Sequence, residues 1–238
     1  MDSATRNVSS KTEKITNYVC DHCNNEFKRE TSLLKHTCEM SRRFNARQNP
    51  VNVVALQLYQ ETYKRWQPGR ALKTWKEFEK SQYYTSFIKF AQYCADCRCV
   101  NTKMYHAWLL DKQVPLHNWN SDKKYADFLI GWTRTESPWD GLERSLQTVS
   151  EWSDDNGKNI GDYFRQASVS RIISDIERGR LTAWLIYTCA SGTEWLGSLD
   201  EKTIMMFYSW ITPDYWYPKV KDNPELSEIK RVTQTLGL

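Results

Sequence analysis

The stretch that decides the first part of the fold runs from Tyr18 to Cys38 and reads YVCDHCNNEFKRETSLLKHTC. Two residues separate Cys20 from Cys23, and twelve residues separate Cys23 from His36. Two thiolates at this spacing can lie on one tight hairpin turn and bind a single Zn²⁺. The spacer accommodates a return strand and about two turns of helix, which would point the histidine back at the hairpin. Because so short a unit cannot be stabilised by hydrophobic burial alone, metal binding must drive its folding.

The fourth ligand is predicted to be Cys38, which follows His36 after one intervening residue. Positions two apart on a helix face different directions, so the helix must end or tighten at His36 if both side chains reach one ion. A thiolate is a good zinc ligand, and no other suitable group lies nearby. His22 lies between the first two cysteines, and we expect its side chain to face away from the metal. The alternative is a chance spacing of free thiols.

With Phe27 and Leu33 as a small core between hairpin and helix, the segment resembles the Cys-Cys-His-His zinc finger family over residues 18–38, about a tenth of the chain. It departs from the family at the last ligand, where the family has a second histidine three to five residues after the first. The resemblance implies a ββα fold, a bound Zn²⁺ and contact between the helix and nucleic acid. We call residues 18–38 the finger.

The resemblance also implies which residues meet nucleic acid. In the family, the residue before the helix and its third and sixth residues contact bases, and here these are Arg29, Ser32 and Lys35. Arginine and lysine can pair with guanine edges in a major groove. One finger covers about three base pairs, so the rest of the basic segment, or a second copy, must add affinity. The cations expected to meet phosphates are Lys28, Arg42, Arg43 and Arg47.

The charge distribution agrees with a polyanionic partner. Residues 1–80 hold 15 Lys and Arg against 9 Asp and Glu, whereas the other 158 residues hold 18 against 20. The basic excess therefore belongs to the finger and the segment after it, and such segments suit a polyanion. No apolar run reaches the roughly 18 residues of a transmembrane helix, and the N-terminus lacks the apolar core of a signal peptide. We expect an intracellular protein with reduced cysteines and no membrane partner.

After the finger, helical patterns dominate. Asn49-Pro50 is a turn or linker signal, and we place a boundary there. Beyond it, apolar residues recur every three or four positions, as at Tyr59, Tyr63 and Trp66. Alternation with a period of two is nearly absent, which predicts an all-α domain. The predicted organisation is a flexible tail at residues 1–17, the finger at 18–38, a basic linker at 39–50 and an all-helical domain at 51–238.

Helix starts can be predicted at two further places. Ser137-Pro138 is an N-cap followed by proline at the first helical position. Ser198 with Glu201 matches a capping box and predicts that the next helix begins there.

Two other groups of residues are candidates for chemistry. Cys94, Cys97 and Cys99 cluster in sequence with His106 seven residues on, and either a second zinc site or buried or partly exposed thiols would explain them. A second group mixes cations with aromatics, which can bind phosphates and stack bases; its alternative is core tryptophans with exposed cations. Its members are Lys64, Arg65, Trp66, Arg70, Lys73, Trp75 and Lys76.

Three functions remain open at this point. The first is a non-enzymatic zinc-finger protein that binds nucleic acid, with DNA favoured over RNA, in DNA metabolism or transcription, with the helical domain as an assembly surface. Its tail and dense aromatics are similar in style to uncharacterised zinc-finger proteins of large DNA phages, which implies a viral role; no defining motif carries this likeness. The second is a protein–protein adaptor. The third is a nucleic-acid-processing enzyme, which predicts an acidic cluster in a cleft of the helical domain.

Overall fold

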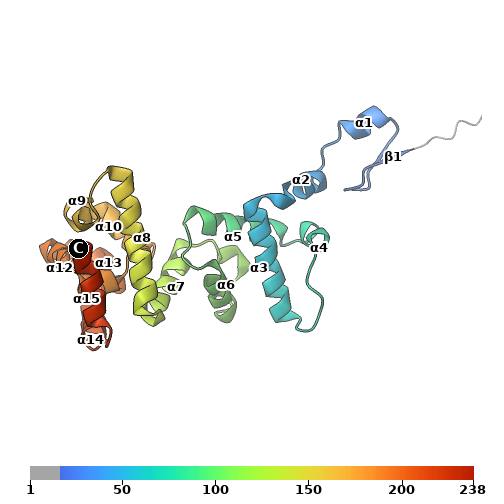
Figure 1. Cartoon of the computed structure of the whole chain (residues 1–238). Coiled ribbons are helices and arrows are strands. Elements are labelled where there is room, and N and C mark those ends of the chain that lie inside the picture. The colour runs from blue at the N-terminus through green and yellow to red at the C-terminus, as the bar shows by residue number, and fades with distance from the viewer. Residues whose placement is uncertain (1–16) are drawn as a thin grey trace, which may run out of the picture. The chain divides into compact units, whose positions relative to one another are not determined.

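The computed structural model describes residues 17–238. All of the predicted flexible tail except Asn17 lies outside the described residues. Within them the protein is mainly α, as the sequence predicts, and its one sheet has two strands (Figure 1). This sheet belongs to the finger.

The described residues form two compact units, which divide between Ile88 and Lys89. The division falls inside α5, Tyr84–Asp96, so this helix contributes to both units. The segment predicted as one helical domain, residues 51–238, is therefore shared between them, and its first part folds with the finger.

The finger has the predicted ββα order. Strands β1, Tyr18–Val19, and β2, Glu26–Phe27, pair antiparallel with Tyr18 opposite Phe27. Helix α1, Glu30–Leu34, follows after a short connection. It has five residues, which is little more than one turn and shorter than the two turns that the spacing suggested. No residue of α1 is buried.

Residues 39–50, predicted as a basic linker, form regular structure instead. They contain α2, Glu39–Asn45, and a 3₁₀ turn, η1, Ala46–Gln48. Helix α3, Pro50–Trp66, then begins at once, because the Asn49 side chain accepts a hydrogen bond from the Val51 backbone N–H at 2.9 Å. Asn49-Pro50 is thus an N-cap with proline at the first helical position, and the boundary predicted there is the start of a helix.

An aromatic cluster joins α3 to the helices that follow it in the first unit. Tyr59 lies with its ring centroid 4.9 Å from that of Phe78, on α4, Trp75–Glu79, and 5.4 Å from that of Phe87. Arg43 of α2 donates a hydrogen bond to the Glu79 backbone carbonyl at 2.6 Å and lies 4.2 Å above the Tyr84 ring. These contacts attach α2 to the aromatic cluster.

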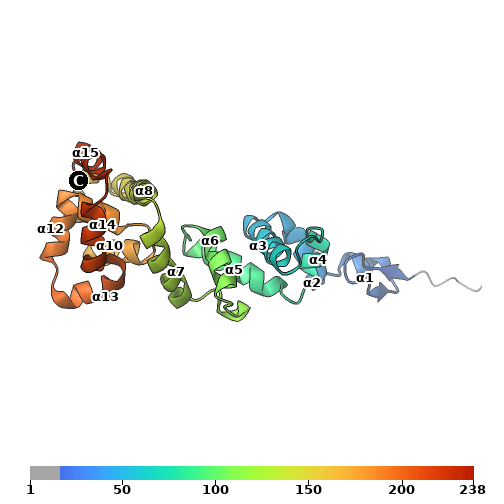
Figure 2. The same ribbon diagram turned by 90° about the horizontal axis from the view of Figure 1, so that it is seen from below.

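The second unit is a helical assembly with its own core. Helix α11 is buried along its whole length and contacts α8, α12, α14 and α15, which Figure 2 shows together. Trp184 of α11 and Trp216 of α14 are fully buried, with ring centroids 5.6 Å apart. The bounds of the helices are α6 Thr102–Asp111, η2 Leu116–Asn118, α7 Asp122–Thr135, α8 Pro138–Asn156, η3 Ile160–Asp162, α9 Tyr163–Gln166, α10 Val169–Glu177, α11 Ala183–Thr188, α12 Ala190–Ser198, α13 Glu201–Ile211, α14 Pro213–Lys221 and α15 Leu226–Thr235.

One of the predicted helix starts is confirmed and the other is wrong. Ser137 caps α8 by accepting from the Asp140 backbone N–H at 3.1 Å. The predicted capping box at Ser198 does not form, because Ser198 is the last residue of α12. Asp200 takes the N-cap of α13 and accepts from the Thr203 backbone N–H at 2.8 Å. A carboxylate two residues closer to the helix supplies the same acceptor.

Candidate metal centre

Four side chains of the finger and its flank come together around one point. The ligand atoms of Cys20, Cys23, His36 and Cys38 all lie within 4.8 Å of one another. Cys20 Sγ lies 4.0 Å from Cys38 Sγ, and Cys23 Sγ lies 3.2 Å from His36 Nε2. A tetrahedral zinc site with ordinary bond lengths has edges of about 3.8 Å between sulfurs and about 3.5 Å between sulfur and nitrogen. The group therefore has the size that a metal ion requires.

The first two cysteines lie on a tight turn between the strands. The Asn24 backbone N–H donates to the Cys20 carbonyl at 2.8 Å, and Asn24 itself has a left-handed φ of 59°. Asparagine tolerates this conformation better than most residues. Backbone N–H groups of Cys23 and His22 point at the Cys20 sulfur and lower the pKa of that thiol. The turn thus favours a thiolate at Cys20, which is the form that binds metal.

Cys23 shows why a cation suits this group. The Asn25 backbone N–H lowers the pKa of the Cys23 thiol, but burial and the neighbouring Cys20 and Cys38 raise it more, so the net direction is upward. Several thiolates at this distance repel one another. The positive charge of a bound cation offsets that repulsion, and each coordinating thiol is then held as a thiolate.

His36 reaches the group because α1 ends before it. The last helical residue is Leu34, and the His36 backbone N–H donates to the Leu33 carbonyl at 3.0 Å, three residues back. This is the tightening at the helix end that the ligand spacing requires. The Phe27 ring packs against the His36 ring with centroids 4.7 Å apart, so a strand residue holds the imidazole in place.

Cys38 joins the group from the next helix rather than from α1. It is the N-cap of α2, and its sulfur accepts a hydrogen bond from the Ser41 backbone N–H at 3.2 Å. The chain turns between His36 and Cys38, which allows two side chains only two positions apart to meet. This arrangement explains the short spacing. Helix α2 was not predicted from the sequence. Its sequence does contain signals typical of helix ends, which are an acidic residue, Glu39, in the first turn and a basic residue, Arg42, in the last turn.

His22 is not part of the group. Its ring packs against Phe44 of α2, with centroids 4.9 Å apart. The prediction that it faces away from the metal agrees with this contact. Together with Cys38, His22 ties the finger to α2.

The cysteines around α5 and α6 are arranged differently. Among residues 17–238, the group at Cys20 is the only one in which three or more possible ligands gather. Cys94 and His106 are buried, and the His106 ring packs 5.1 Å from the Trp119 ring. Burial raises the pKa of the Cys97 thiol to about 12. Cys94 is thus a core thiol and Cys97 and Cys99 are half-buried thiols, and the described structure does not gather them with His106 into a metal-sized group.

The carboxylates of the second unit do not form a metal-sized cluster among the described residues either. Its buried Asp175 is held by structural contacts, since Tyr163 Oη donates to it at 2.9 Å and Arg171 Nε at 2.7 Å. Such a carboxylate links α9 to α10 rather than facing a cleft.

The residues predicted to meet nucleic acid lie in two kinds of environment. Arg43 is engaged within the protein, with its side chain 19% exposed and paired to Glu39 at 3.1 Å as well as to α4. Arg47 is exposed but lies 3.9 Å above the Phe44 ring. The remaining predicted contacts are all exposed: Lys28, Arg29, Ser32, Lys35 and Arg42.

Comparisons with known proteins return no match to a family model, to a curated protein or to a solved structure. Within residues 17–238, none of the helices combines the length and the apolar character needed to cross a lipid bilayer.

Proposed function

We propose that the finger binds one Zn²⁺ and uses its helix to contact DNA. The observation that carries the proposal is the gathering of three sulfurs and one imidazole nitrogen within 4.8 Å, a donor set typical of structural zinc. A site closed by four protein ligands leaves no open position for catalysis, so its role is to fold the finger.

The exposed face of the finger supports the choice of partner. Arg29, at the N-cap of α1, is followed by Ser32 and Lys35 at intervals of three residues, which places the three on one helical face. All three are exposed. Lys28 and Arg42 lie on either side of this run in sequence and would meet phosphates. Arg43 is left out of this interface, because its guanidinium is engaged with α4 and the aromatic cluster. The role in DNA metabolism or transcription follows from this binding, and a viral role stays a prediction.

A salt-titrated binding assay tests the proposal. The full chain, loaded with zinc, is titrated against a fluorescent DNA duplex at several salt concentrations, with an RNA duplex in parallel. We expect affinity to fall steeply with salt, because each phosphate contact contributes about 0.9 to the slope. Arg29→Ala combined with Lys35→Ala should cost about 1–3 kcal/mol for each base contact removed.

The control is Lys230→Ala, which removes an exposed cation from α15 in the other unit. It should leave the affinity unchanged. If the double variant binds DNA as well as the unaltered protein, or if no binding is seen at low salt, the finger does not read DNA through this face.

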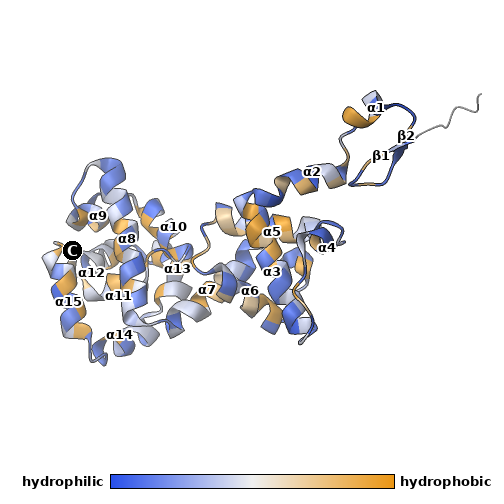
Figure 3. Ribbon diagram, turned by 45° about the vertical axis from the view of Figure 1, so that its right-hand side comes forward, coloured by the Kyte–Doolittle hydropathy of each residue, from blue (hydrophilic) through white to orange (hydrophobic). Residues whose placement is uncertain are grey.

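One observation favours the second function, a finger that binds protein. Leu34, at the end of α1, is 77% exposed, and Figure 3 shows this end of α1 as apolar. A protein partner at this end of α1 would remove the leucine side chain from water, which is favourable. The assay above separates the two functions, because an adaptor binds no duplex and is indifferent to Arg29 and Lys35.

A further inference from the structure

A second basic and aromatic surface lies at the end of α3 in the same unit as the finger. From Gln60 to Lys76 the chain has five cations and one acid. Within it, Trp66 is 54% exposed and Leu72 is 61% exposed. The alternative in which Trp66 is a core residue is therefore wrong, because more than half of this residue is exposed.

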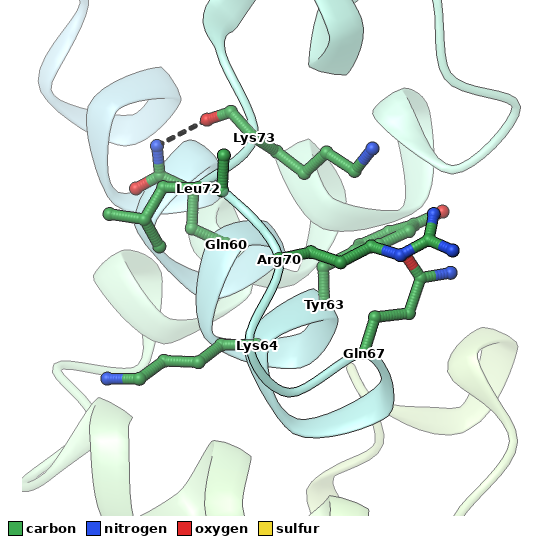
Figure 4. A pocket seen from close by; sticks show the side chains of 8 residues that line it. Gln60, Tyr63, Lys64, Gln67, Arg70, Leu72 and Lys73 are labelled. Atoms are coloured by element: carbon green, nitrogen blue, oxygen red, sulfur yellow. Dashed lines mark hydrogen bonds between the residues drawn. The ribbon is translucent and has the colours of Figure 1, made fainter.

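Trp66, Tyr63, Arg70 and Lys73 lie together in one patch at this end of α3. The Trp66 and Tyr63 rings lie with centroids 5.7 Å apart, and the Lys73 Nζ lies 5.3 Å from the Tyr63 ring centroid. Figure 4 shows Arg70 and Lys73 extending to the same side, with the Tyr63 ring beside Arg70, and Lys64 pointing away on the other side of the helix end. The backbone here is held to α3, because Gln60 Nε2 donates to the Lys73 carbonyl at 2.6 Å.

The charges of this patch are unequally neutralised. Glu77 pairs with Lys73 at 2.9 Å and also closes the capping box of α4 with Thr74. The hydrogen bond from the Thr74 backbone N–H has the larger effect on the Glu77 carboxylate, and the hydrogen bond from the Lys73 ammonium has the next largest. Together they lower the pKa of Glu77 to about 2. Among residues 17–238, no carboxylate forms an ion pair with Lys64, Arg70 or Lys76. Arg70, left unpaired beside the Tyr63 ring that Trp66 contacts, suits an external anion.

The shape of the patch restricts the ligand. The hollow between α3 and the loop that follows it has a volume of about 10 Å³, which is room for no more than one water molecule. A base or a nucleotide cannot enter it. The surface instead suits an extended polyanion laid across it, with flat groups that can stack on the indole.

We propose that Trp66 with Arg70 binds single-stranded nucleic acid, so that an unpaired base stacks on the indole while the guanidinium meets an adjacent phosphate. An exposed aromatic face beside a basic track is the feature that single-strand binding needs. A duplex has its bases already stacked and would use the cations alone. The proposal rests on the proposed function for the choice of a nucleic acid, and it assigns the unpaired strand to a surface separate from the finger helix.

The test compares single-stranded and duplex DNA with the zinc-loaded full chain. Probes are a fluorescent oligothymidylate and a fluorescent duplex of mixed sequence. Trp66→Ala should weaken binding of oligothymidylate about 5- to 150-fold, and Trp66→Phe should restore much of it. Duplex affinity should change less than about twofold, since phosphate contacts remain. The matched control is Tyr217→Ala, which removes a 59% exposed aromatic from the second unit and should have no effect.

The finger variant separates this proposal from the previous one. Arg29→Ala with Lys35→Ala should reduce duplex binding and leave the effect of Trp66→Ala on oligothymidylate intact. If the finger variant has no effect on duplex binding while Trp66→Ala still weakens oligothymidylate binding, the finger proposal fails and this one stands. The present proposal is overturned if Trp66→Ala binds oligothymidylate like the unaltered chain, or if the chain binds no single strand at low salt. It is equally overturned if polyglutamate displaces the fluorescent oligothymidylate as well as unlabelled oligothymidylate does, and if Trp66→Ala abolishes this displacement. The surface would then bind acidic protein.

Discussion

Removing the metal ion is expected to unfold the finger and leave the helices from α3 onward folded. Apart from its ligands, the finger has two strands of two residues each and a five-residue helix without a buried side chain. Metal binding contributes about 10–16 kcal/mol in zinc-finger peptides, which is as much as the stability of a whole domain. The aromatic cluster around Tyr59 and the core around Trp184 do not involve the ligands, so they should persist.

Amide resonances report on the folding of the finger, and tryptophan emission reports on the folding of the helices after it. A chelator should abolish the dispersed amide resonances of residues 18–38 in a nitrogen-edited spectrum. Tryptophan emission should stay unchanged, because all eleven tryptophans lie at Trp66 or later. Cys20→Ser should reproduce the effect of the chelator, whereas Cys97→Ser, which changes a thiol outside the group, should not. Unchanged finger amides in excess chelator would show that the finger folds without a metal.

Cys38 has two roles that a pair of variants can separate. Serine at this position keeps an oxygen that can accept from the Ser41 N–H at the N-cap of α2, but it removes the thiolate. Cys38→Ser should therefore retain α2 but bind the metal more weakly. Loss of a residue that only hydrogen-bonds to a ligand weakens metal binding roughly 10–100-fold, and loss of the ligand itself should cost more. Cys38→Ala should lose both, with a further destabilisation of about 1 kcal/mol for the missing cap.

A chelator competition assay gives the metal affinities, and urea unfolding gives the stability difference between the two variants. His22→Ala is the matched control, since its ring contacts Phe44 and lies outside the ligand group. Metal affinity of Cys38→Ser equal to that of the unaltered chain would assign the fourth coordination position to another donor.

The helical class could be predicted because its local signals are strong. Ser137-Pro138 begins α8 as expected, and Pro68-Gly69 follows the end of α3, with Gly69 at a φ of 83°. Helix α2 could not be predicted, since its orientation depends on contacts distant in sequence, such as that of Arg43 with the Glu79 carbonyl. The division between units lies within α5, where no glycine or proline marks it.

The residues that gather at the candidate site could be predicted from the sequence, but the elements that carry them could not. The spacing of Cys20, Cys23 and His36 indicates one ion, because a hairpin and a short helix return the imidazole to the thiols. The position of Cys38 on a separate helix depends on the turn after His36, which short-range patterns do not encode. The sequence alone could not decide whether Trp66 is exposed, because a tryptophan at helical spacing is more often in a core.

X-ray absorption at the zinc edge of the purified full chain tests the central claim most directly. The account predicts one zinc ion per chain with three sulfurs at about 2.3 Å and one nitrogen at about 2.0–2.1 Å. A chain without bound metal, or a first shell without sulfur, would contradict it.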